Sequence, residues 1–237
     1  WHLNIQHIGA QTRFLHNLIS DRAVVVAYLE AATKSWPQWR KNYGDARIPA
    51  IVQAVKQRLP NAPMRMVLTG HSGGGSFTFG YLNEVKSIPP EVERIAFLDS
   101  NYAYNRSNHL AKLLAWLKSP RGGRMCVLAY DDANALLDGK PFVTAAGGTW
   151  GKSHAMLADL GERFKFERTM RGEIEVQSAA KGRIQFLLKA NPEQKIYHTI
   201  QVERNGFIHA MLTGTPLEGK GYEYFGDRAY EQWIESD

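Results

Sequence analysis

The stretch VLTGHSGGGSF at residues 67–77 holds the pattern G-x-S-x-G, with Ser72 as its serine. Arg65–Thr69, at the start of this stretch, has the apolar and β-branched composition of a strand. The residues that follow the glycines place apolar side chains at helical spacing as far as Val85. A serine between a strand and a helix is the context in which this pattern marks a nucleophile at a sharp turn.

The turn itself favours a nucleophilic Ser72. Gly70 and Gly74 lie two residues before and two after the serine, where we expect backbone segments to pass too closely for side chains. The backbone N–H of Gly73 would begin the helix and face a developing oxyanion. A phosphate-binding loop is the alternative, but the stretch lacks the Gly-Lys-Ser/Thr of a Walker loop and the G-x-G-x-x-G of a dinucleotide site.

Outside this turn, strand patterns and helix patterns alternate along the chain. We therefore predict an α/β fold, a mostly parallel sheet with helices on both faces, as a single domain over residues 1–237. Residues 133–194 are less regular and are expected to form an insertion with one packing helix near Ser153–Phe164. The expected strands are Ala23–Tyr28, Arg65–Thr69, Arg94–Leu98, Arg124–Tyr130 and Lys195–Val202, and the other expected helices are Ile48–Leu59, Asn108–Leu117 and Arg228–Ile234.

A serine hydroxyl needs a histidine to remove its proton, and in this kind of fold the histidine follows the serine in the chain. The histidines after Ser72 are His109, His154, His198 and His209. His109 would open a helix, His154 lies in the expected insertion, and His198 alternates within the expected last strand. His209, in the expected loop after that strand, is therefore predicted to be the general base.

The carboxylate that orients the histidine is left open among three aspartates. Asp131 and Asp132 follow the buried run Arg124–Tyr130, and Asp99 follows the preceding strand. Asp132 is preferred because it lies farther past the strand, where a loop can turn its carboxylate toward His209. Asp131 and Asp99 remain alternatives.

The chain has the Gly70–Gly74 turn, an aspartate after a later strand and a histidine after the last expected strand. This arrangement resembles that of the α/β-hydrolase superfamily, which includes serine esterases and lipases. The resemblance covers most of the chain and identifies no subfamily. It implies a serine hydrolase that cleaves an ester or related acyl bond through an acyl-enzyme on Ser72, with no metal or organic cofactor. An acyltransferase and an inactive binding protein of the same fold are the alternatives.

The resemblance also implies a second oxyanion donor, on a loop that should precede Ala23. Only Trp1–Arg22 is available there, so the sheet is expected to lack the family's first strands. The backbone N–H of Trp1, or of His2, is the candidate that we name beside Gly73. The sequence does not begin with Met, and a signal peptide before it would make the protein secreted or periplasmic; we derive no compartment.

Composition limits the partners. The net charge is +6 with scattered basic residues, so we expect no nucleic-acid partner. The resemblance implies a small-molecule ester or acyl substrate. No apolar stretch approaches the roughly 18 residues of a membrane span. The single cysteine, Cys126, is expected in the core.

Two further groups of residues bear on a metal site and on a substrate pocket. His2, His7 and His16 are spaced too irregularly to share a helical face, so they predict no metal site. Several aromatic residues fall in loops after expected strand ends, where this architecture places its substrate pocket. They are candidate lining residues, and they are Trp36, Trp39, Tyr43, Tyr102 and Tyr104.

Overall fold

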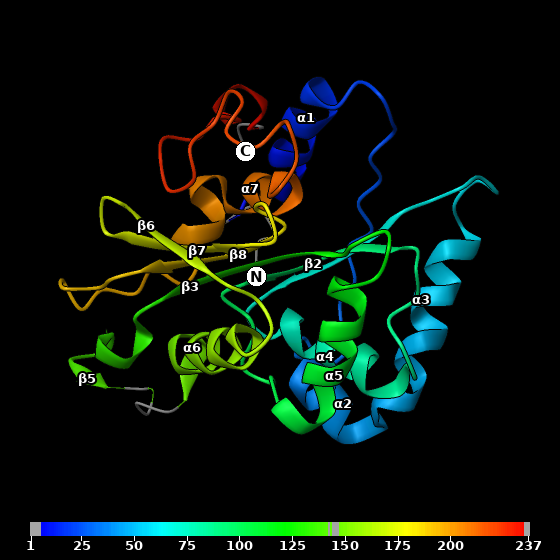
Figure 1. The fold of residues 1–237 in the computed structure, drawn as a ribbon, viewed down its shortest axis with the longest axis horizontal. Coiled ribbons are helices and arrows are strands. Elements are labelled where there is room, and N and C mark those ends of the chain that lie inside the picture. The colour runs from blue at the N-terminus through cyan, green and yellow to red at the C-terminus, as the bar shows by residue number, and fades with distance from the viewer. Residues whose placement is uncertain (1–5, 142, 144–146, 235–237) are drawn as a thin grey trace.

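The computed structural model describes residues 6–141, 143 and 147–234, and a six-stranded sheet with the order β1-β2-β3-β8-β7-β6 lies at its centre (Figure 1). The strands that pair in parallel are β1 (Met66–His71), β2 (Val92–Leu98), β3 (Arg124–Tyr130) and β8 (Ile184–Lys189). An antiparallel hairpin of β6 (Glu167–Arg171) and β7 (Ile174–Ala179) completes the sheet. The chain thus has the predicted α/β fold with a mostly parallel sheet.

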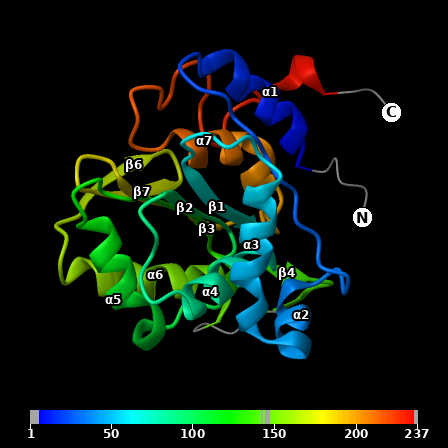
Figure 2. The ribbon, with the colours of Figure 1, turned by 90° about the vertical axis from the view of Figure 1, so that its right-hand side faces the viewer.

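Two groups of helices cover the two faces of the sheet (Figures 1 and 2). One face carries α1 (Ile8–Leu18) and α7 (Phe207–Leu212). The other face carries α2 (Trp36–Tyr43), α3 (Ile48–Gln57), α4 (Gly74–Glu84), α5 (Arg106–Leu117) and α6 (Gly148–Gly161). The smaller elements are a two-stranded sheet of β4 (Leu136–Leu137) and β5 (Lys140–Pro141), and the short helices η2 (Asp45–Arg47), η3 (Asp132–Asn134), η4 (Val202–Gly206) and η5 (Glu231–Trp233).

The central strands are buried on both faces, which explains their nearly continuous apolar sequence. Successive residues point into different clusters: Phe97 and Val127 pack with α4 and α5, whereas Leu98 and Cys126 pack with α1 and α7. Cys126 is a free, buried thiol, as expected, and burial raises its pKa to about 12.

The strand expected at Ala23–Tyr28 does not form. This segment is extended but pairs with no strand, and Val25 and Tyr28 are 64% and 65% exposed. It runs from α1 to α2 (Figure 2). Among the described residues β1 is therefore an edge strand, although its turn carries the candidate nucleophile.

The prediction of a strand at Lys195–Val202 is also wrong. The backbone N–H groups of Gln201 and Glu203 bond the carbonyls of Tyr197 and Thr199, which are the i to i−4 bonds of helical turns. Of the apolar residues in this segment, Val202 is buried in the cluster that includes α7, whereas Ile196 is 40% exposed. The last parallel strand is β8 instead, so residues 190–201 form the segment that follows it.

Residues 133–194, expected to be an irregular insertion, contribute the helix α6 and half of the main sheet, since β6, β7 and β8 all lie there. The charged sequence of β6 hid this strand, because every residue of β6 is exposed. The expected C-terminal helix Arg228–Ile234 is reduced to the single turn η5.

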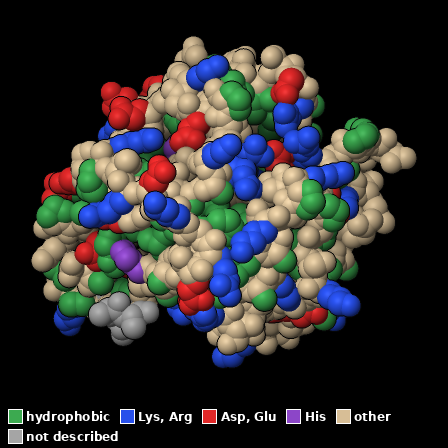
Figure 3. All heavy atoms as spheres, viewed as in Figure 1, with side chains coloured by type: hydrophobic (Ala, Val, Ile, Leu, Met, Phe, Trp, Pro, Cys, Tyr) green, Lys and Arg blue, Asp and Glu red, His purple; other side chains and the backbone are tan. Residues whose placement is uncertain are grey.

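No described helix is long and apolar enough to cross a membrane. Lys and Arg side chains occur over most of the face seen in Figure 3, with acidic and apolar side chains among them. This distribution agrees with the scattered basic residues of the sequence.

His109 is a buried histidine that links α4 and α5. Its Nδ1 accepts the backbone N–H of Asn105 at 2.9 Å, and its Nε2 donates to the side-chain carbonyl of Asn83 at 2.8 Å. This pattern requires a neutral ring. Burial, reinforced by Lys112 and Arg40, lowers the pKa of His109 to about 4.

We predict that His109 makes the protein less stable as the pH falls from about 6.5 to about 4. In this range the unfolded chain binds a proton that the folded chain excludes, so the free energy of unfolding drops by at most about 1.4 kcal/mol per pH unit for this group. Urea unfolding at several pH values should show a shallower pH dependence for His109→Gln. The exposed His154→Gln serves as the control, and identical slopes for wild type and His109→Gln would contradict the prediction.

Candidate active site

Ser72 lies at a strained turn between β1 and α4. Its φ is 52°, in the left-handed region that residues with a side chain rarely adopt, and its side chain is half-buried. Its carbonyl accepts the backbone N–H of Gly75 at 3.2 Å, so the chain turns directly from the strand into the helix. This is the geometry expected of a serine lifted above the carboxyl end of a parallel strand.

Gly70 and Gly75, rather than Gly70 and Gly74, are the glycines that the turn requires. A Cβ on Gly70 would lie 2.5 Å from the carbonyl carbon of Gly74. One on Gly75 would lie 2.7 Å from the carbonyl carbon of Ser100 and still closer to its oxygen. A Cβ on Gly74 would meet nothing within 4 Å. The expectation for Gly74 is therefore wrong, because its Cα faces open space while its backbone presses on Gly70.

An aspartate and a histidine meet at the same edge of the sheet as Ser72. Asp99 follows β2 directly and is fully buried, with a left-handed φ of 49°. His198, from the segment after β8, places its Nδ1 2.5 Å from Asp99 Oδ2 and keeps 24% of its side chain exposed. His198 Nε2 bonds no described residue. The pair is therefore an oriented imidazole with one nitrogen held by a carboxylate and the other free.

His71, beside Ser72 in the chain, anchors the backbone of His198. His71 Nε2 donates to the His198 carbonyl at 3.0 Å, Gln6 Nε2 donates to His71 Nδ1 at 2.5 Å, and the two imidazole rings are 4.3 Å apart. Burial, helped by His198, lowers the pKa of His71 to about 3, so its ring is neutral and can donate and accept at once. His71 thus ties the segment after β8 to the turn that carries Ser72.

Asp132 bonds the first turn of α6 and bonds no histidine. Its carboxylate accepts the backbone N–H groups of Thr149 at 2.8 Å and Trp150 at 3.2 Å, which holds the first turn of α6. Burial raises the pKa of Asp132 despite these bonds. The hydroxyl of Thr149 donates to Asp99 Oδ1, so Asp132 acts on Asp99 through Thr149.

His209 is not at this edge of the sheet. It lies on α7, 1% exposed, with Nδ1 3.2 Å from the hydroxyl of Tyr222. The next turn of its helix ends at Thr213, whose carbonyl accepts a bond from Arg94 near the start of β2. Arg94 precedes the end of β2 by four residues, or about 13 Å of strand. The pairing expected for His209 is therefore corrected: the histidine that meets an aspartate near Ser72 is His198.

The remaining predicted site residues are dispersed. Asp131 accepts from Asn134 Nδ2 at 2.9 Å and bonds no histidine among the described residues. Trp1 and His2 lie outside the described residues. Gly73 is the capping residue directly before α4. A Cβ on Gly73 would lie 3.2 Å from Pro37, at the start of α2. The first turn of α2 thus lies over the turn of Ser72.

The aromatic residues divide into two groups. Trp36, Trp39 and Tyr43 line up along α2, with successive ring centroids 5.4 and 5.3 Å apart, and Trp36 packs on Phe77 just after the turn. Tyr102 is 41% exposed, and burial of its hydroxyl end beside Asp99 and Asp132 raises its pKa. Tyr104 is instead buried, with its hydroxyl bonded to Asp159.

Comparisons with known proteins give no match to a family model, a curated protein or a solved structure. The likeness to α/β-hydrolases therefore depends on the fold and the turn alone. Among the described residues, no group of three histidine, cysteine, aspartate or glutamate side chains could hold a metal ion.

Sequence reasoning placed Ser72 at a turn between a strand and a helix and did not place His198 beside Asp99, because an alternating pattern made residues 195–202 resemble a strand. The chain order serine, aspartate, histidine is satisfied by Ser72, Asp99 and His198 as well as by the predicted set. That order was the signal available for His198. No sequence signal singled out Thr149, which acts only through its contacts.

We predict that Gly75→Ala destabilises the fold by about 1–3 kcal/mol, because the new methyl group would overlap the carbonyl of Ser100. Gly74→Ala in the same turn is the matched control. It should change stability by no more than about 1 kcal/mol, in the favourable direction, because alanine prefers the helix. Urea unfolding of both variants measures the difference, and equal stabilities would refute the steric argument.

Proposed function

We propose that the protein is a serine hydrolase that cleaves an ester or related acyl bond, with Ser72 as nucleophile, His198 as general base and Asp99 as the orienting acid. The observation that supports this most is the bond of 2.5 Å between His198 Nδ1 and Asp99, beside the strained turn of Ser72. Nucleophile, imidazole and carboxylate are the three parts that acyl transfer on serine requires.

In the proposed reaction, Ser72 Oγ attacks the acyl carbon while His198 Nε2 takes the hydroxyl proton. The imidazolium then gives this proton to the leaving alcohol, and an acyl-enzyme remains. Water attacks the acyl-enzyme and gives a proton to His198, which returns it to Ser72 Oγ as the carboxylic acid leaves. Asp99 keeps the proton on Nδ1, which leaves Nε2 available as the base, and its negative charge stabilises the imidazolium.

Ser72 and His198 form no hydrogen bond in the structure, so the proposal requires their side chains to approach when substrate binds. Such bonds are often long or absent in unliganded enzymes. The contact between His71 and the His198 backbone favours this approach, because it already fixes the two chain segments side by side.

The oxyanion of the tetrahedral intermediate needs backbone donors. Gly73 offers its N–H at the start of α4, where the helix dipole adds positive charge. As second donor we propose the N–H of Trp36 in place of that of Trp1. Trp36 is the first residue of α2, so its N–H has no acceptor within the helix, and the adjacent Pro37 contacts Gly73.

We predict that a fluorophosphonate probe labels the wild-type protein and not Ser72→Ala. His198→Gln and Asp99→Asn should each lower the rate of p-nitrophenyl ester hydrolysis by about 10³- to 10⁴-fold, because the serine loses its base or the base loses its correct tautomer. The matched control is His154→Gln, an exposed histidine bonded only to its own helix at Trp150. It should react like wild type.

Labelling of Ser72→Ala at the wild-type rate would overturn the nucleophile. Full activity of folded His198→Gln, checked by circular dichroism, would overturn the base. If added alcohols capture the acyl group faster than water does, the protein is an acyltransferase on the same serine.

Thr149 is predicted to be a positioning residue for Asp99. Thr149→Val keeps the shape of this fully buried side chain and removes the hydroxyl that donates to Asp99, so kcat should fall by about tenfold with KM unchanged. Thr149→Ser restores the hydroxyl and should recover most of kcat. A purely structural role would give equal losses for Val and Ser in steady-state kinetics.

A further inference from the structure

A polar cavity lies beside α7, on the face of the sheet that α1 and α7 cover. Its volume is about 260 Å³, and His209, Arg171, Glu218, Tyr222 and Tyr224 line it together with Gly219 and Glu223. His209, Tyr222 and Tyr224 are buried, whereas Arg171 and Glu223 are exposed and form the rim. The proposed hydrolase site uses none of these residues.

His209 presents an unsatisfied donor to this cavity. Its Nδ1 lies 3.2 Å from the hydroxyl of Tyr222. With the Tyr222 hydroxyl donating to Nδ1, the ring proton of the neutral histidine lies on Nε2. Nε2 is buried and bonds no described residue. Leaving such a donor unpaired costs about 1–3 kcal/mol.

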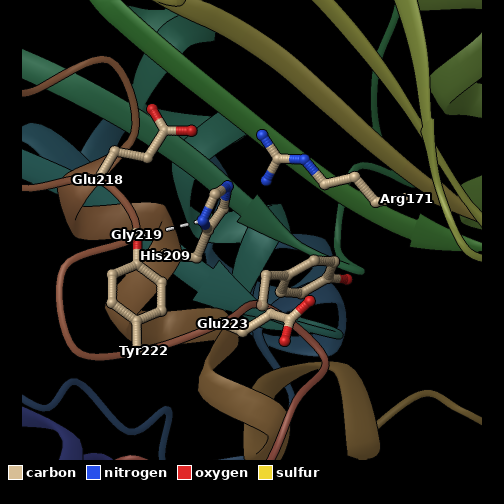
Figure 4. A pocket seen from close by; sticks show the side chains of 7 residues that line it. Arg171, His209, Glu218, Gly219, Tyr222 and Glu223 are labelled. Carbon is tan, nitrogen blue, oxygen red and sulfur yellow. Dashed lines mark hydrogen bonds between the residues drawn. The ribbon is translucent and has the colours of Figure 1, made fainter.

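Figure 4 shows what surrounds this nitrogen: the guanidinium of Arg171 and the carboxylate of Glu218 both point toward the space beside it. The guanidinium of Arg171 makes no hydrogen bond or ion pair with any other described residue, although its backbone pairs with Ile174. A guanidinium and an imidazole N–H thus converge on one cavity without an acceptor between them.

Glu218 forms no hydrogen bond with His209 Nε2 or with Arg171, and its oxygens accept from other groups. Both lie 3.0 Å from Gln185 Nε2, and Oε2 also accepts the backbone N–H of Gly214 at 2.7 Å. Arg94, buried nearby and electrostatically coupled to Glu218, keeps one guanidinium nitrogen, Nη1, unpartnered. Arg171 and Arg94 therefore place two guanidiniums near His209, beside the carboxylates of Glu218 and Glu223.

We propose that this cavity binds a small ligand through an oxyanion group, a carboxylate or a phosphate, which accepts hydrogen bonds from His209 Nε2 and Arg171. A carboxylate or phosphate oxygen supplies the missing acceptor, and the charge of Arg171 strengthens the hydrogen bond to it. The volume exceeds that of a single water many times over, so it holds a group of several atoms, and the rings of Tyr222 and Tyr224 offer an apolar wall.

The test is titration calorimetry of the whole protein with sodium phosphate and with sodium acetate, each against sodium chloride at equal ionic strength. We expect saturable binding of at least one of the two oxyanions and none of chloride; the two arms identify the preferred group. In ¹⁵N spectra of the histidine rings, the Nε2 resonance of His209 should shift with the same saturation curve.

Arg171→Gln is the decisive variant, since this exposed side chain can be changed without disturbing the core. It should weaken binding by about tenfold or more, because a charge-assisted hydrogen bond is lost. Arg168→Gln removes the same charge from the same strand, at a side chain that pairs with Glu175 outside the cavity, and should bind like wild type. No saturable binding of either oxyanion, or equal weakening by both variants, would overturn the proposal.

Discussion

The parallel pairing of β1, β2, β3 and β8 is the constraint on which the candidate site depends. Parallel strands end at one edge of the sheet, so the residues that follow them become neighbours although they are far apart in the sequence. Ser72 follows β1, Asp99 follows β2, Asp132 follows β3, and His198 lies in the segment after β8. Each strand end contributes one polar group.

Close backbone packing then fixes these groups. Gly70 and Gly75 let the turn of Ser72 press against α4 and against Ser100, which follows β2. The bond from the Ser100 hydroxyl to the Gly70 carbonyl, at 2.7 Å, joins the first two strand ends a second time. Substituents at these points would separate Ser72 from Asp99, so the strained φ values of both residues are held by the same contacts.

Four histidines have distinct environments that follow from their partners. His71 and His109 are neutral and satisfied at both nitrogens, so they hold chain segments together. His198 has a carboxylate on one side and a free nitrogen on the other, which suits proton transfer. His209 is buried with one nitrogen unpaired beside two guanidiniums, which suits binding of an anion. The hydrogen-bond partners of each ring, rather than its burial, distinguish these cases.

The sequence by itself determined the fold class, the nucleophile turn and the central strands, because these depend on local composition: β-branched runs, glycines around a serine, and helical spacing. It failed for the apolar run at residues 23–28 and for the alternating residues 195–202, because both patterns fit a strand but neither backbone finds a partner in the sheet. It also missed β6, which is exposed along its length.

The pairing of His198 with Asp99, in place of the expected pairing of His209 with Asp132 or Asp131, is visible only in the tertiary structure. All of these residues satisfy the same chain order, and a sequence pattern cannot distinguish one histidine or one aspartate from another. Pairing of strands separated by dozens of residues places Asp99 and His198 at one sheet edge and His209 far along the strands from it. Such distances depend on long-range packing, which no local stretch of sequence encodes.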